Sequence, residues 1–119
     1  SVSPLENVNG PWARLLEVAK NYDALFLDMF GVIHDGSRAY PDAPEMVQAL
    51  LDAGKTIVVL SNSPRRKAVV QARLEQLGFP NVHDIVTSGE LAWNLFCTRP
   101  GAPFDNTLGR RCVMFGSGG

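Results

Sequence analysis

Two short apolar segments constrain the fold of this chain more than any other feature of its sequence. Residues 24–30 form the first, and residues 56–60, which are β-branched almost throughout, form the second. Each is only long enough for a strand, and turn residues such as Gly31 and Pro64 follow them. Continuous apolar runs of this length are typical of parallel strands that are buried on both faces. The sequence therefore predicts a parallel β-sheet.

Helical patterns alternate with these strands along the chain. Apolar residues recur at helical spacing, and prolines and glycines mark the ends of the segments. Besides the two strands, we expect helices at residues 11–20, 44–53, 64–77 and 89–96, the last capped by Ser88, and strands at residues 84–86 and 111–115. This alternation predicts an α/β fold, a Rossmann-like parallel sheet with helices on both faces.

Length and charge exclude several classes of function. The chain has 119 residues and a formal net charge of -1, without the clustered lysines and arginines that nucleic-acid binding requires. Its apolar runs are far shorter than the roughly 20 residues needed to cross a bilayer, and no signal-peptide pattern opens it. Two cysteines, Cys97 and Cys112, are too few for a disulfide framework. We therefore expect a cytoplasmic protein that binds neither nucleic acid nor membrane.

The candidate site lies where the two strands end, because ligands of such sheets bind outside the carboxyl ends of the strands. Asp28 lies in the first apolar segment, where a carboxylate needs compensating partners. It either accepts hydrogen bonds from the amides of residues 31–35, a structural role, or acts as a nucleophile beside a divalent cation. Ser61 and Asn62 either hold phosphoryl oxygens or serve as ordinary loop residues. Taken together, before a helix N-terminus that suits anions, these residues favour a phosphate site.

Several spaced motifs resemble those of the haloacid dehalogenase (HAD) superfamily. The matching segments are LDMFGVI, HDG and YPDAP at residues 27–44, VLSNSPR at residues 59–65, LGF at residues 77–79 and IVTSGE at residues 85–90. Within the superfamily they are most similar to class IIA, the sugar-phosphate, nucleotide and pyridoxal-phosphate phosphatases. The resemblance implies that Asp28 is a phosphoryl-accepting nucleophile and that Ser61, Asn62 and Gly31 bind the phosphorylated small-molecule substrate. It also implies a Mg²⁺ ion held by the Asp28 carboxylate and the backbone carbonyl of Phe30.

One departure from the family pattern concerns catalysis. The usual motif has a second aspartate two residues after the nucleophile, which protonates the leaving alcohol and then activates water, whereas this chain has Phe30. General acid–base help of this kind is worth about 10²- to 10⁴-fold in rate. Whether His34 or Asp35 takes over this role stays open. So do two alternatives to an enzyme, a phospho-ligand-binding pseudoenzyme and a receiver-type domain.

The domain organisation follows from the same resemblance. We expect residues 1–22 to form an N-terminal extension with a helix and residues 23–119 to form the first half of a HAD-like catalytic core. In the family, a cap domain follows roughly this part of the core. A catalytic-motif lysine and an acidic, metal-binding Gly-Asp motif lie downstream of that cap. We therefore expect these 119 residues alone to be inactive. An exposed half-core also favours self-association or the swapping of elements between copies.

Overall fold

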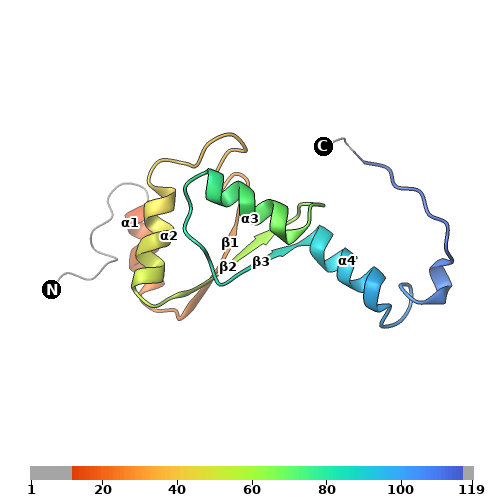
Figure 1. Ribbon diagram of the computed structural model, residues 1–119. Helices are drawn as coiled ribbons and strands as arrows, with labels where there is room; N and C mark the ends of the chain where they lie inside the picture. Colours follow the sequence, from red (N-terminus) through yellow and green to blue (C-terminus); the bar gives the residue numbers. More distant parts are fainter. Residues whose placement is uncertain (1–11, 117–119) are drawn as a thin grey trace.

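A three-stranded parallel sheet forms the centre of the molecule. A computed structural model describes residues 12–116. The strands β1 (Ala24–Asp28), β2 (Thr56–Ser61) and β3 (Asp84–Thr87) lie side by side in the order β1-β2-β3 (Figure 1). Asp28 is paired in register with Leu60, and Ser61 with Thr87. The carboxyl ends of all three strands therefore meet at one edge of the sheet.

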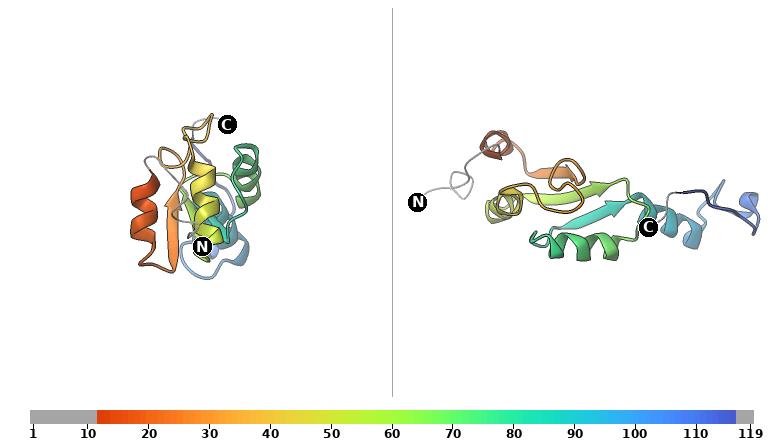
Figure 2. Two further views of the ribbon diagram at one scale, coloured as in Figure 1. Left: turned by 90° about the vertical axis from the view of Figure 1, so that its left-hand side faces the viewer. Right: turned by 90° about the horizontal axis from the view of Figure 1, so that it is seen from above.

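Helices precede, connect and follow the strands. They are α1 (Ala13–Ala19), α2 (Ala43–Asp52), α3 (Lys67–Gln76), α4 (Ser88–Thr98) and the short 3-10 helix η3 (Asn106–Leu108). Helix α2 packs against β2, α3 packs against β3, and α1 lies beside α2 (Figures 1 and 2). The Rossmann-like α/β fold class is thus confirmed.

The core lies on one face of the sheet. Leu27, Val59 and Ile85 are paired across the three strands and are 6%, 1% and 5% exposed. On the other face, Phe26 is 68% exposed and Leu60 is 41% exposed. Among the described residues, therefore, the helices do not cover both faces as predicted. The reason is that both crossovers step in the same direction, so right-handed connections place α2 and α3 on the same face.

Helix α4 projects away from the sheet. It continues directly from β3, and the segment after it runs further from the core as far as η3 before it turns back (Figures 1 and 2). None of its residues is buried. No helix in the described part of the chain is long and apolar enough to cross a membrane, and no cap domain occurs there.

Some boundaries differ from those expected. The strand predicted at residues 111–115 is absent, and Val113, Met114 and Phe115 there are 75%, 81% and 90% exposed. A strand needs a neighbour to satisfy its backbone groups, and none lies beside this segment (Figure 1). Helix α3 begins at Lys67 rather than residue 64, and α4 is capped by Thr87 rather than Ser88. Residues 1–11 of the predicted N-terminal extension lie outside the described residues.

Candidate functional site

A cleft of about 1130 Å³ opens at the carboxyl ends of β1 and β2. Asp28, Phe30, Ser61 and Asn62 all line it, so four of the five predicted site residues come together. Asp28 and Ser61 are the last residues of adjacent parallel strands, and Asn62 follows directly. This placement agrees with the rule that ligands bind outside the carboxyl ends of such strands.

Asp28 is exposed in this cleft rather than buried in the strand. One oxygen of its carboxylate accepts a hydrogen bond from the amide of Met29, at 2.8 Å. The structural role that the sequence suggested, with donors from the amides of residues 31–35, is not the arrangement found. Its carboxylate therefore stays available to a ligand in the cleft.

Gly31, the fifth predicted site residue, does not line the cleft. Its φ of 80° lies in the left-handed region that favours glycine, so it turns the chain after β1. Its amide donates a hydrogen bond to the carbonyl of His34 at 2.8 Å. The glycine therefore shapes the loop, and its amide is already engaged.

His34 is a buried residue beside the cleft, and it is 5% exposed. Its Nδ1 accepts a hydrogen bond from the amide of Gly36 at 2.9 Å, which places the proton of the neutral ring on Nε2. Among the described residues, Nε2 has no hydrogen-bond partner. Burial, and then the nearby Arg73, lower the pKa of His34, against a smaller opposing effect of Asp35. Burial therefore favours the neutral form of the ring over the charged form.

Asp35, the other residue considered as a replacement acid, is engaged within its own loop. One oxygen of its carboxylate accepts hydrogen bonds from the amides of Ser37 and Arg38, both at 2.8 Å. These bonds lower the pKa of Asp35, and the residue is not part of the cleft lining. Of the two candidates, only His34 borders the cleft.

Phe30 occupies the position at which the family usually has an acid–base aspartate. Its ring is 71% exposed and meets His34 edge to face, with ring centroids 6.2 Å apart. Neither ring carries a carboxyl group. The cleft therefore has a nucleophile candidate, Asp28, but no second carboxylate two residues beyond it.

The cleft also carries two positive charges. Arg65 and Arg73 both line it, and a guanidinium nitrogen of Arg73 donates to the carbonyl of Gly36 at 2.6 Å. The run of basic residues starting at Arg65 has the pattern of an ordinary solvated helix face. Only the fold shows that a cation from α3 and one from the loop before it border the same space. Their charge favours an anionic ligand.

The residues that would hold a metal form an incomplete set. Mg²⁺ prefers about six oxygen ligands in an octahedral arrangement. Asp28 offers a carboxylate and Phe30 a backbone carbonyl, so the donors are of the right kind. Among residues 12–116, however, no group of three or more metal-ligating side chains occurs. This chain fits the family's metal only in part.

Comparison with known families decides the classification. The model of the family described as haloacid dehalogenase-like hydrolase matches residues 25–119. The chain belongs to this family. The predicted resemblance to the HAD superfamily is therefore confirmed, and the receiver-type alternative is wrong.

HAD-like relatives with assigned names include phosphatases. The chain is 34% identical over 109 residues to chronophin from Bos taurus, covering 89% of this chain and 36% of that protein. It is 34% identical over 86 residues to human glycerol-3-phosphate phosphatase, covering 71% of this chain and 27% of that protein. The chain thus spans about a third of the length of these relatives.

Two solved structures share the fold. A hydrolase of the haloacid dehalogenase-like family from Brucella suis 1330 superposes with a TM-score of 0.62 and 34% sequence identity, covering 67% of this chain and 31% of that one. A hypothetical protein from Pyrococcus horikoshii OT3 gives a TM-score of 0.56 and 30% identity, covering 69% of this chain and 32% of that one.

Proposed function

We propose that these residues form the first part of a class IIA HAD phosphatase that hydrolyses phosphate monoesters through a phosphorylated aspartate. The observation that carries this proposal is the meeting of Asp28, Ser61 and Asn62 in one cleft at the ends of adjacent parallel strands. The relative named glycerol-3-phosphate phosphatase supports the same class of reaction.

In the proposed reaction, Asp28 supplies the nucleophile. A carboxylate oxygen of Asp28 attacks phosphorus, the bond between phosphorus and the ester oxygen breaks, and the alcohol leaves as its oxyanion. Water then attacks the phosphorus of the aspartyl phosphate, and the bond between phosphorus and the Asp28 oxygen breaks, which releases inorganic phosphate and restores the carboxylate. The proton that the water loses balances the proton that the alkoxide takes up to become the alcohol. Ser61 and Asn62 bind the phosphoryl oxygens during both steps, and Arg65 and Arg73 attract the anionic substrate into the cleft.

The proposed phosphatase reaction uses Mg²⁺ as its cofactor. The Asp28 carboxylate and the Phe30 carbonyl would hold it together with water and carboxylates from other parts of the full-length protein. Bound there, the ion neutralises charge on the transferred phosphoryl group.

The deciding experiment replaces Asp28 by asparagine in the full-length protein. An amide is no nucleophile, so Mg²⁺-dependent hydrolysis of para-nitrophenyl phosphate should fall to background, and no acyl phosphate should be trapped by hydroxylamine. Asp42→Asn is the matched control, because Asp42 is exposed outside the cleft and its φ of 64° suits asparagine equally well. Retention of activity by Asp28→Asn would exclude the aspartyl-phosphate route.

A second candidate function rests on Phe30. Because this exposed ring stands where the acid–base carboxylate belongs, the protein would bind a phosphorylated ligand without turning it over. Saturable binding of a phosphate ester by the full-length protein, with no hydrolysis in the presence of Mg²⁺, would favour this pseudoenzyme over the phosphatase.

A further inference from the structure

Four consecutive residues, beginning with the last residue of β3, each contact the segment in which β2 ends. That segment, the 61–66 loop, comprises Ser61 at the end of β2 and the five residues before α3; the four residues are Thr87, which caps helix α4, and residues 88–90, which open it. The Thr87 hydroxyl donates to the carbonyl of Arg65 at 2.8 Å, and the Ser88 hydroxyl donates to Asn62 Oδ1 at 2.7 Å. The two segments are therefore joined near both ends of the loop.

Gly89 makes the tightest of these contacts. Its amide donates to the carbonyl of Ser63 at 2.9 Å. A Cβ atom at this position would lie 2.0 Å from the carbonyl oxygen of Pro64 and 2.7 Å from that of Arg65. The backbone of α4 can approach the loop this closely only because the residue has no side chain.

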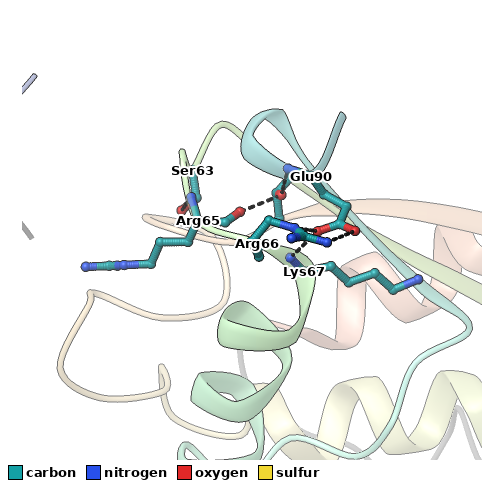
Figure 3. Close-up of polar contacts among 6 residues, drawn as sticks. Ser63, Arg65, Arg66, Lys67 and Glu90 are labelled. Atoms are coloured by element: carbon teal, nitrogen blue, oxygen red, sulfur yellow. Dashed lines mark hydrogen bonds and ion pairs between the residues drawn. The ribbon is translucent and has the colours of Figure 1, made fainter. Parts of the chain in front are cut away.

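Glu90 joins the loop to helix α3. Its carboxylate accepts from Arg66 Nε at 2.6 Å and Arg66 Nη2 at 3.2 Å, and also from the backbone amide of Lys67 at 3.0 Å (Figure 3). Lys67 is the first residue of α3, so Glu90 satisfies one of the free amides at the start of that helix. The guanidinium of Arg66 also lies over the ring of Trp93, 4.1 Å from its centroid.

These contacts are not what the local sequence would produce by itself. Thr87 and Glu90 have the spacing of a capping box, in which the glutamate returns to the amide of the capping residue. The Thr87 hydroxyl does accept from the Glu90 amide, at 2.9 Å. The Glu90 carboxylate, however, points to the 61–66 loop, as Figure 3 shows. Its hydrogen bonds also lower the pKa of Glu90 to about 2, mainly through Arg66, so it stays charged at neutral pH.

We propose that residues 87–90 position the 61–66 loop so that Ser61 and Asn62 hold the phosphoryl group, and that Glu90 contributes most to this positioning. Glu90 is then a positioning residue that acts through Arg66 and Lys67 and does not touch the substrate. This inference rests on the proposed function, because it assigns phosphoryl binding to the loop. It adds a role for a segment that does not line the cleft itself, although Thr87 and Ser88 border a smaller hollow beside Asp28.

The test compares Glu90→Ala with the matched control Glu75→Ala in the full-length protein. Glu75 is an exposed glutamate on α3 that does not line the cleft. The Arg66–Glu90 pair lies at the surface, with side chains 45% and 23% exposed, and ion pairs there contribute little to global stability, so both variants should remain folded. Amide exchange of Lys67 should accelerate about tenfold or more in Glu90→Ala alone. The inhibition constant of inorganic phosphate should rise by about the same factor, with a larger effect on KM than on kcat.

Glu90→Gln provides the conservative rescue. The side-chain amide oxygen of the glutamine can still accept a hydrogen bond from the Lys67 amide, but the negative charge that pairs with Arg66 is lost. In Glu90→Gln, the exchange rate of the Lys67 amide and the inhibition constant of phosphate should therefore lie between the values of wild type and Glu90→Ala. Ile57→Val lowers stability through the core, because Ile57 is fully buried in β2. It should leave both loop measurements unchanged.

Two outcomes would overturn the proposal. One is unchanged Lys67 exchange in Glu90→Ala, and the other is faster exchange with an unchanged phosphate inhibition constant. If Glu90→Ala fails to fold, Glu90→Gln decides by the same two measurements. If the wild-type protein neither hydrolyses phosphate esters nor binds phosphate, the proposed function fails and the phosphoryl-binding role of the loop fails with it. The exchange data then report separately whether Glu90 fixes the loop.

Discussion

Gly89 and Pro64 lie so close that a single methyl group does not fit between them. A Cβ atom on Gly89 would be 2.0 Å from the carbonyl oxygen of Pro64, which is backbone and has no flexible end to move aside. Any side chain at position 89 must therefore displace the loop after β2 or the start of α4.

Gly89→Ala should accordingly lower activity although residue 89 does not line the cleft. We expect kcat/KM of the full-length protein for a phosphate ester to fall about tenfold or more, since small displacements of binding groups are costly. Gly101→Ala is the control, because a Cβ there meets nothing within 4 Å. Equal activity of the two variants, both shown to be folded by circular dichroism, would contradict the close approach seen here.

Phe30→Asp tests the missing acid–base group. The new carboxyl group lies two residues beyond the nucleophile and can protonate the leaving oxyanion, so hydrolysis should accelerate, by up to about 10²-fold for a sugar phosphate. The gain should be small for para-nitrophenyl phosphate, whose phenolate leaves unaided. Phe30→Asn is the matched control, because it has the same shape and no acid. A gain of the same size in Phe30→Asn, or on both substrates, would argue against an empty acid–base position.

The isolated chain should bind Mg²⁺ poorly. Its cleft offers one carboxylate, Asp28, and no group of three or more metal-ligating side chains occurs among the described residues. Isothermal titration should give a dissociation constant weaker than about 1 mM, and no turnover of para-nitrophenyl phosphate should be detected. Tight binding by the 119-residue chain would show that the donor set is more complete than the geometry indicates.

His34 should make the stability of the fold depend on pH. Its pKa is lowered in the folded state, chiefly by burial, so the unfolded state takes up a proton first. The free energy of unfolding should therefore be greatest above the ordinary histidine pKa of about 6.5 and decrease as the pH falls below it. Urea denaturation at about pH 7.5 and about pH 5.5 measures this slope.

The control for this prediction is His34→Gln, which keeps a hydrogen-bonding side chain that does not titrate. The part of the slope due to His34 should disappear in this variant, whereas His83→Gln should retain it. A slope of the same size in wild type and His34→Gln would assign the pH dependence to other groups.

The sequence predicts the elements of this fold better than their ends. The strand at residues 56–60 is found almost as expected, because a run of β-branched apolar residues suits the pleated, buried surface of a central strand. Helix α3 begins three residues later than the sequence suggests, at Lys67 instead of residue 64. At that end the Glu90 carboxylate, 23 residues along the chain, accepts the Lys67 amide, a contact that local sequence does not specify. The false strand at residues 111–115 likewise reflects long-range structure, since strand pairing depends on a neighbour that local sequence does not specify.

The sequence predicts the site residues that lie at the ends of strands. Asp28 and Ser61 are polar residues that end apolar strands, so their meeting follows from the parallel order. Arg73 and Glu90 give no such signal, because each has the sequence pattern of an ordinary exposed helix residue. Their roles depend on which loop the fold brings beside them.

The spatial order of the strands has a consequence for biosynthesis. Because β1, β2 and β3 lie in the order in which they leave the ribosome, each new strand finds its neighbour already made and no strand has to insert between two others. All residues that line the cleft, and also Glu90, have been synthesised once translation reaches residue 90. Domains fold largely as they emerge, at about 5–20 residues per second. The 61–66 loop and residues 87–90 that contact it can therefore assemble on the nascent chain within seconds, before any later segment is available to template them.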